Sequence, residues 1–267
     1  MNVAIQEFGQ YTERMNAALD DKLFFLDKVD ADVYFDFGCA DGALLRRLKE
    51  LCPGKTYIGF DTNPEMILNA MAIESVIQYR TEISAATELL NQTKGTKALI
   101  LSSVIHEIYA YANPTEFWDW VWQMQFDYIV IRDMSVSRET ASNITDFDDV
   151  RKVIEKSEHD HLHQFQMKYG HLDWEKNLAH WLLKYHYIDG WDKEVKYQRK
   201  DNWERELNEN YFGLYYEDLL KLIPQGYIIA QNEHFTLPYI KDKVKRDLDI
   251  DFQTKTHVKL ILRKMDV

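Results

Sequence analysis

The sequence predicts an α/β fold in which helices cover both faces of a mostly parallel sheet. Over residues 30–135, short apolar runs of strand length alternate with longer segments of helical periodicity. The apolar runs, such as Val33–Phe37 and Lys97–Ser102, show little polar alternation, which is typical of parallel strands buried on both faces. Glycine and polar residues follow several of these runs, as expected where a strand turns into a helix.

The first half of the chain supplies most of these elements. A helix is predicted over residues 43–52, because Leu44, Leu45, Leu48 and Leu51 recur at helical spacing, and a Pro–Gly pair ends it. The helix that begins at Pro64 has Asn63 as its expected N-cap. Strands are predicted at 33–37, 56–61, 76–80, 97–102 and 128–132, and further helices at 3–29, 85–91, after residue 106, and at 114–123.

The alternation stops after Asp133, and the second half is organised differently. Residues 140–223 are polar, aromatic and helical in pattern, with predicted helices at 146–169, 174–185 and 214–222. Two late strands, 227–230 and 257–262, lack an amphipathic segment of helix length between them and predict an antiparallel pair at the sheet edge. We therefore expect a core domain of residues 1–136 and 224–267 with a helical insertion at 137–223.

Composition narrows the class of protein. The 267 residues are 46% hydrophobic and 28% charged, enough for one core and a smaller insertion. A net charge of −12 argues against broad, non-specific nucleic-acid binding. No apolar run reaches the roughly 20 residues of a membrane span, and no signal peptide is visible. The two cysteines form no metal-type pair, which favours a reduced, cytoplasmic protein.

The turn between the first strand and the first helix carries ligand-binding features. Gly38 and Gly42 permit positive φ or close approach of a ligand. Asp61 lies 19 residues after Gly42, at the tip of the next strand, where a carboxylate can accept hydrogen bonds from both ribose hydroxyls. Asp41 beside the turn would repel a pyrophosphate but suits a cofactor with positive charge. The pattern therefore favours a cationic, adenosine-containing cofactor over a dinucleotide.

The stretch Asp36-Phe37-Gly38-Cys39-Ala40-Asp41-Gly42 resembles motif I of the class I S-adenosylmethionine-dependent methyltransferases, D/E-x-G-x-G-x-G, with Ala40 in place of the middle glycine. The resemblance implies a Rossmann-like, doubly wound, mostly parallel seven-stranded sheet whose last strand runs antiparallel between its neighbours. It also implies S-adenosyl-L-methionine as the cofactor, methyl transfer to an acceptor, and a role for the insertion in substrate recognition or as a lid.

The resemblance also implies roles for single residues. The backbone of Gly38, Ala40 and Gly42 would lie against the methionine moiety, and Asp61 would take the ribose hydroxyls. The other cofactor-binding residues that it implies are Asp36 and Asp41 at the turn, Thr81 and Glu82 beside the adenine, Ser102 beside the methionine portion, and Arg14 near the cofactor carboxylate.

Methyl transfer from a sulfonium is an in-line displacement, so the protein mainly aligns the reactants and excludes water. His106 follows a strand tip and is expected either to orient or deprotonate the nucleophile, or to cap and pack a helix start. Asp133, at the tip of the fifth strand, is expected to hold a substrate hydroxyl or amine. The alternative for Asp133 is a surface ion pair with Arg132.

The acceptor is less constrained by the sequence. Of His159, His161 and His163, only the first and third share a helix face, so no metal site is predicted there. Residues 181–205 could stack bases, yet ten acidic against eleven basic residues over 151–205 favour a packed helical core. A small molecule or peptide acceptor is preferred, and RNA stays open; no membrane partner is expected. The alternatives are an aminopropyl-type transferase on the same fold and a non-catalytic scaffold.

Overall fold

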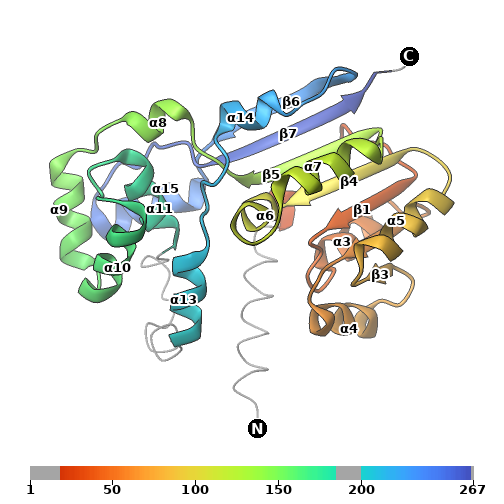
Figure 1. Ribbon diagram of the computed structural model, residues 1–267, viewed down its shortest axis with the longest axis horizontal. Coiled ribbons are helices and arrows are strands. Elements are labelled where there is room, and N and C mark those ends of the chain that lie inside the picture. The colour runs from red at the N-terminus through yellow and green to blue at the C-terminus, as the bar shows by residue number, and fades with distance from the viewer. Residues whose placement is uncertain (1–18, 185–199, 266–267) are drawn as a thin grey trace, which may run out of the picture.

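The computed structural model describes residues 19–184 and 200–265, which form one seven-stranded sheet with helices on both faces (Figure 1). The strand order is β3-β2-β1-β4-β5-β7-β6. β7 runs antiparallel to both β5 and β6, while β1 to β5 are parallel. This confirms the predicted fold class, including the position of the last strand between its neighbours. The strands are β1 (Val33–Phe37), β2 (Thr56–Phe60), β3 (Gln78–Arg80), β4 (Lys97–Ser102), β5 (Tyr128–Met134), β6 (Tyr227–Phe235) and β7 (His257–Lys264).

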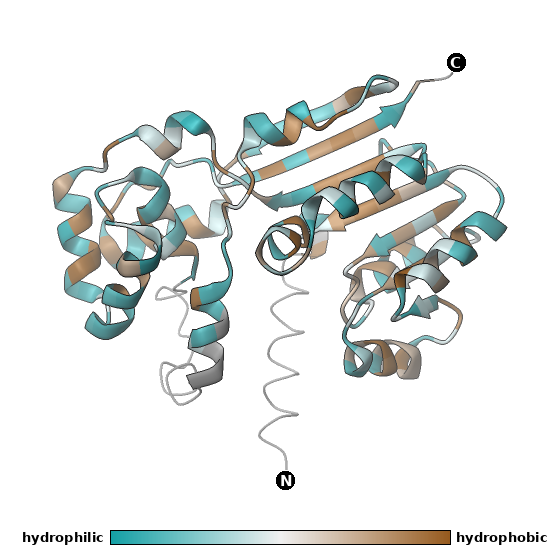
Figure 2. Cartoon of the chain, in the orientation of Figure 1, coloured by the Kyte–Doolittle hydropathy of each residue, from teal (hydrophilic) through white to brown (hydrophobic). Residues whose placement is uncertain are grey.

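Two apolar clusters cover the two faces of the sheet. One face packs against α5 (Ile83–Gln92), α6 (Ile105–Tyr111), α7 (Pro114–Gln123) and α14 (Tyr216–Lys221). The other packs against α3 (Ala43–Leu51), α4 (Pro64–Ile73) and residues next to α2 (Leu19–Lys22). Figure 2 shows hydrophobic residues along the central strands and mixed residues along the helices. Burial on both faces explains why the strands read as continuous apolar runs.

Short-range signals set several helix starts. The Asn63 side chain accepts hydrogen bonds from the backbone N–H groups of Glu65 and Met66, which confirms the predicted cap of α4. Asn113 caps α7 in the same way. In both helices proline occupies the first turn, where its missing N–H leaves no bond unmade.

The described part of the segment between β5 and β6 is helical, and a helix that follows β6 also contributes side chains to its buried core. The elements are α8 (Arg138–Ser142), α9 (Phe147–Lys156), α10 (His159–Tyr169), α11 (Glu175–Lys184), α13 (Lys200–Asn208) and α14. Their cluster of buried side chains includes Ile240, Val244 and Leu248 of α15 (Pro238–Leu248), which contacts α9. Leu219 of α14 packs instead on the sheet. The predicted division at 137–223 remains a prediction.

Several predicted elements were wrong in extent or were missed; among them, β6 continues to Phe235 and the helix predicted at 3–29 ends at Lys22. The predicted helix 146–169 is two helices, because the Glu158 carboxylate caps a new helix by accepting from Asp160 and His161 N–H. α15 lies between the two late strands, where no helix was expected. α6 begins at Ile105, so that His106 sits inside its first turn. β5 continues to Met134, because pairing with β7 extends it past the predicted end. Of the predicted helix 3–29, residues 3–18 lie outside the described residues.

Within the described ranges, no helix combines the length and the apolar character needed to cross a membrane.

Candidate functional site

The loop after β1 lies against the end of β2 at the carboxyl edge of the sheet. The N–H groups of Gly38 and Cys39 donate to the carbonyl of Phe60, at 2.7 and 2.9 Å. Gly38 has φ of 79°, and a Cβ there would lie 2.7 Å from a methyl carbon of Val104. Gly42 has φ of 75°, and its Cβ would lie 2.2 Å from the Tyr79 hydroxyl. Both positions therefore require glycine for conformation and for space.

Ala40 adopts a left-handed backbone conformation that glycine takes without strain. Its φ is 45°, which costs a non-glycine residue about 1–2 kcal/mol. Its N–H donates to Asp61 Oδ2 at 2.8 Å. The methyl group therefore adds strain to the backbone of the loop.

Asp61 joins the loop to the helix that follows β2. Besides the bond from Ala40, its Oδ1 accepts from the N–H of Asn63 at 2.8 Å. Asn63, and not Asp61, caps α4. The half-buried carboxylate is therefore held in one orientation at the carboxyl end of β2.

The two other acids of the motif differ in environment. Asp41 Oδ1 accepts from the N–H of Ala43 at 3.1 Å, and its Oδ2 lies 3.2 Å from a guanidinium nitrogen of Arg46. The charge of Asp41 is thus balanced within α3. Asp36 is 3% exposed, and burial raises its pKa to about 7, an effect that Asp61 reinforces and Lys22 opposes.

Lys22 is a second cation near this loop, after Arg46, that the sequence did not indicate. Asp21 accepts from Arg132 Nε at 2.6 Å and pairs with Lys259, which docks α2 on β5 and β7. Lys22 next to it is half-buried; burial and Arg132 lower its pKa, while Asp36, Asp41 and Asp133 oppose the shift. Nothing in the sequence of this short polar helix indicates that its lysine would lie near the loop after β1. Arg14, the basic residue that the sequence suggested, lies outside the described residues.

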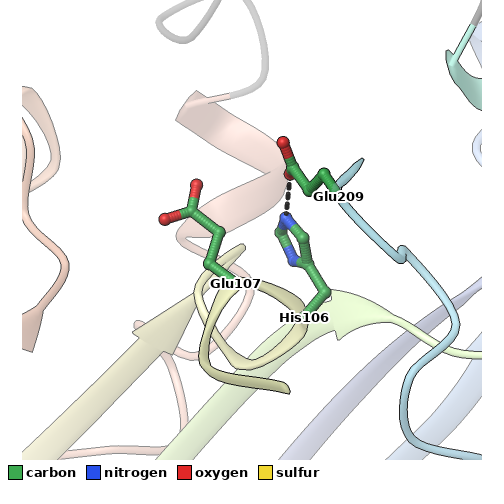
Figure 3. A group of neighbouring side chains, drawn as sticks. All are labelled: His106, Glu107 and Glu209. Carbon is green, nitrogen blue, oxygen red and sulfur yellow. Dashed lines mark hydrogen bonds and ion pairs between the residues drawn. The ribbon is translucent and has the colours of Figure 1, made fainter. Parts of the chain in front are cut away.

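His106 and Asp133 form a buried pair that extends to the insertion. His106 Nδ1 lies 2.6 Å from Asp133 Oδ1, and its Nε2 lies 2.9 Å from Glu209 Oε1, after α13 (Figure 3). Asp133 also accepts from the N–H groups of Val104 and Ile105 at the start of α6, and from that of Met134. The alternative of a surface Arg132–Asp133 pair is wrong, because Asp133 is 2% exposed and Arg132 pairs with Asp21.

The contacts of His106 determine what its ring can do. Burial alone would lower the pKa of His106, whereas Asp133 and Glu209 together raise it to about 10. At neutral pH the ring is then an imidazolium bonded at both nitrogens. In this state it orients its neighbours and cannot accept a proton. Burial raises the pKa of Asp133, but His106 and the backbone N–H groups lower it overall.

The remaining candidates lie along the same edge. Ser102 ends β4, and its buried hydroxyl has no hydrogen-bond partner in the described part of the chain. Thr81 and Glu82 follow β3, one strand further out than Asp61, and Glu82 precedes α5 with an exposed side chain that makes no cap bond. The residues that the fold brings to one edge are Asp36, Gly38, Ala40, Asp41, Gly42, Asp61, Thr81, Glu82, Ser102, His106 and Asp133. Their roles in binding and catalysis stay predictions.

Comparison with known proteins places the fold. No protein-family model matches the sequence, and no curated protein sequence matches it. Among solved structures, the chain resembles the plantazolicin methyltransferase BamL, solved with a triazolic desmethylPZN analog and SAH, at TM-score 0.52 and 11% identity, over 96% of this chain and 88% of that one. It also resembles a SAM-dependent methyltransferase from Anabaena variabilis at TM-score 0.51 and 14% identity, over 93% and 84%. The chain thus has the fold of the class I S-adenosylmethionine-dependent methyltransferases.

Proposed function

We propose that this protein binds S-adenosyl-L-methionine at the carboxyl edge of β1, β2 and β4 and transfers its methyl group to an acceptor. The observation that carries the proposal is the fixed Asp61 carboxylate beside the left-handed loop 38–42. A carboxylate there can accept from both ribose hydroxyls, while the loop backbone approaches the methionine portion. The shared fold with BamL, which was solved with SAH, supports the same cofactor class.

Charged side chains would bind the carboxylate and the amino group of the cofactor. Lys22 is the described cation that would meet the cofactor carboxylate, and Arg14 remains a second candidate for it. Asp36, ionised once a cation lies beside it, would hold the cofactor amino group. Thr81 and Glu82 would border the adenine, and the unpartnered hydroxyl of Ser102 would contact the methionine portion.

In the proposed mechanism the protein aligns the acceptor with the methyl group and excludes water. His106 positions the start of α6 and the Glu209 loop, and Asp133 fixes His106. Because carboxylates engage both ring nitrogens of His106, we assign His106 a positioning role, and we propose an acceptor whose nucleophilic lone pair is available at neutral pH without a general base.

A small molecule or a peptide is the acceptor class that we propose. The core of the insertion supports this, because Trp181, Trp203 and Tyr211 are buried in it and cannot stack on bases; Phe147 and Trp174 are the exposed aromatic side chains among the described residues of the insertion. BamL was solved with a desmethylPZN analog, an acceptor-like compound rather than a nucleic acid. Cys39 and Cys52 are both unpaired, which fits the proposed cytoplasmic location.

An aminopropyl-type transferase is the second candidate. Such an enzyme uses a decarboxylated cofactor, so a cation at the carboxylate end would have no partner. Lys22 beside the loop therefore favours methyl transfer. A non-catalytic scaffold is disfavoured, because Ala40 retains a strained conformation that a loop without a ligand would not need.

A thermal-shift measurement with S-adenosylhomocysteine tests the cofactor assignment. The wild-type protein should melt at a higher temperature with this ligand, because binding to the native state stabilises it. Asp61→Ala should lose the shift, and Asp119→Ala, an exposed acid on α7, should keep it. No shift in the wild-type protein, by this method and by calorimetry, would refute the proposed function.

A further inference from the structure

Three potential metal ligands converge at the joint between the sheet and the insertion. His106 and Glu107 lie in the first turn of α6, and Glu209 follows α13 (Figure 3). One ligand atom from each side chain lies within 4.8 Å of the other two. His106 and Glu209 are buried, and Glu107 is half-buried. The cluster therefore combines one imidazole and two carboxylates in a setting with little solvent.

The spacing is close to that of ligands on a single ion. His106 Nε2 and Glu209 Oε1 are 2.9 Å apart, a hydrogen-bond distance in the metal-free protein, and two tetrahedral ligand atoms with metal bonds of about 2.0–2.2 Å lie about 3.4 Å apart, so a small separation of these two side chains admits the ion. With such bonds, two ligand atoms on one ion lie at most about 4.2 Å apart. The separations in the cluster reach up to 4.8 Å, so the ion needs at most a small approach of the Glu107 carboxylate, which stands on a side chain with three rotatable bonds.

A further carboxylate orients the imidazole from behind. Asp133 Oδ1 lies 2.6 Å from His106 Nδ1, so Nε2 is the ring nitrogen that faces Glu209. Asp133 is itself fixed by backbone N–H groups of Val104, Ile105 and Met134. A carboxylate that holds the far nitrogen of a ligating histidine is the usual outer support of a metal site, since it sets the tautomer and the ring orientation.

We propose that His106, Glu107 and Glu209 bind a divalent first-row transition-metal ion of the Zn²⁺ type, which replaces the proton that His106 Nε2 shares with Glu209 in the metal-free protein and releases it to solvent. An imidazole with two carboxylates favours such an ion over Mg²⁺ or Ca²⁺, which prefer oxygen ligands alone. Three protein ligands leave one position open, as in sites where the ion contacts a substrate. A role for that position in holding the methyl acceptor rests on the proposed function, whereas binding of the ion does not.

Metal content after dialysis tests this site. Tag-free protein is stripped with a chelator, loaded with Zn²⁺, dialysed against metal-free buffer and measured by mass spectrometry. The wild-type protein should retain one equivalent, and Glu107→Gln and Glu209→Gln should each lose most of it, because each removes one of three ligands. Glu107→Gln alters a half-buried side chain, so its circular dichroism should match that of the wild-type protein and separate ligand loss from misfolding.

A double variant on α10 controls for adventitious binding. His159 and His163 share a helix face, and His159 is 93% exposed, so this surface could take up Zn²⁺. His159→Gln/His163→Gln should retain the full equivalent. The proposed site is overturned if this double variant loses the ion, if Glu107→Gln and Glu209→Gln both keep it, or if the wild-type protein retains none. Stabilisation of the metal-free protein by S-adenosylhomocysteine is read separately, so failure of the metal site leaves the proposed function standing.

Discussion

Three residues near the first loop lead to tests at the scale of single side chains, and Ala40 gives the simplest. Ala40→Gly removes the left-handed penalty of about 1–2 kcal/mol and increases the entropy of the unfolded chain by about 0.5–1 kcal/mol. The free energy of unfolding in urea should therefore rise by roughly 0.5–1 kcal/mol. Ala85→Gly within α5 is the matched control and should lower it by about 1 kcal/mol. Equal losses in both variants would show that Ala40 is not strained.

The raised pKa of Asp36 predicts that the free energy of unfolding depends on pH. Its folded-state pKa of about 7 lies above the ordinary 3.8, so ionisation at higher pH destabilises the folded protein. The penalty is small near pH 4, grows as pH rises, and is complete above pH 7. Asp36→Asn removes it, so the free energy of unfolding of the variant, relative to that of the wild-type protein, should increase by about 3 kcal/mol from pH 5 to pH 8. Unfolding curves at both pH values check this, with exposed Asp119→Asn expected to show no such trend.

Lys22 predicts a preference for the intact carboxylate of the cofactor. A hydrogen bond to a charged group is worth about 1.5–3 kcal/mol, which corresponds to roughly 10- to 100-fold in affinity. The wild-type protein should bind S-adenosylhomocysteine more tightly than its decarboxylated analogue by this factor, as measured by calorimetry. Lys22→Met should bind the two equally. A preference that survives in Lys22→Met would assign the carboxylate to another cation.

At the scale of elements, the negative charge of Asp133 should contribute more to stability than its hydrogen bonds to the N–H groups at the start of α6. Asp133→Asn keeps an acceptor for the α6 N–H groups but leaves the buried imidazolium of His106 without one of its carboxylates, which should cost about 3–5 kcal/mol. Asp146→Asn is the control, because Asp146 caps α9 on the surface and asparagine caps equally well. Chemical denaturation measures both. If Asp133→Asn leaves the free energy of unfolding unchanged, the Asp133–His106 pair contributes only hydrogen bonding.

The elements also differ in how well the sequence predicted them. The starts of α4 and α7 were readable because Asn63, Asn113 and the prolines act within one turn. α15 was missed although Ile240, Val244 and Leu248 recur at helical spacing, because the charged residues between them hide a narrow apolar stripe whose packing partners lie in the insertion. Likewise, no local pattern marks Glu209, whose partner His106 lies 103 residues away in the chain.

At the scale of the whole molecule, the packing predicts which helices lose their protection from hydrogen exchange together. Ile240→Ala in α15 opens a cavity in the insertion core and should cost about 2–5 kcal/mol, with faster hydrogen exchange in α9 and α11. Leu219→Ala in α14 should cost a similar amount but accelerate exchange in α6 and α7. Leu219 lies inside the predicted insertion 137–223, and Ile240 lies outside it. Faster exchange of α9 and α11 in Leu219→Ala, and of α6 and α7 in Ile240→Ala, would support these boundaries.

The strand order across the sheet was predicted in outline from the motif, because a resemblance in one loop implies the topology of the whole fold. The site was predicted less completely. Backbone positions such as Gly38 and Gly42 were identifiable, since glycine marks conformations that other residues avoid. The charges around them were not, because Lys22 reaches the loop only through the docking of α2, and Arg46 pairs with Asp41 only once α3 has formed.

The position of β7 constrains the order of assembly on the ribosome. β7 follows β6 in the chain but lies between β5 and β6, and pairs with both along most of its length. During synthesis β1 to β5 can therefore pair as they emerge, whereas β6 has no neighbour until β7 is made. Until then the outer edges of β5 and β6 both expose unpaired backbone groups, and a nascent chain stalled at this stage would be the form most prone to aggregate.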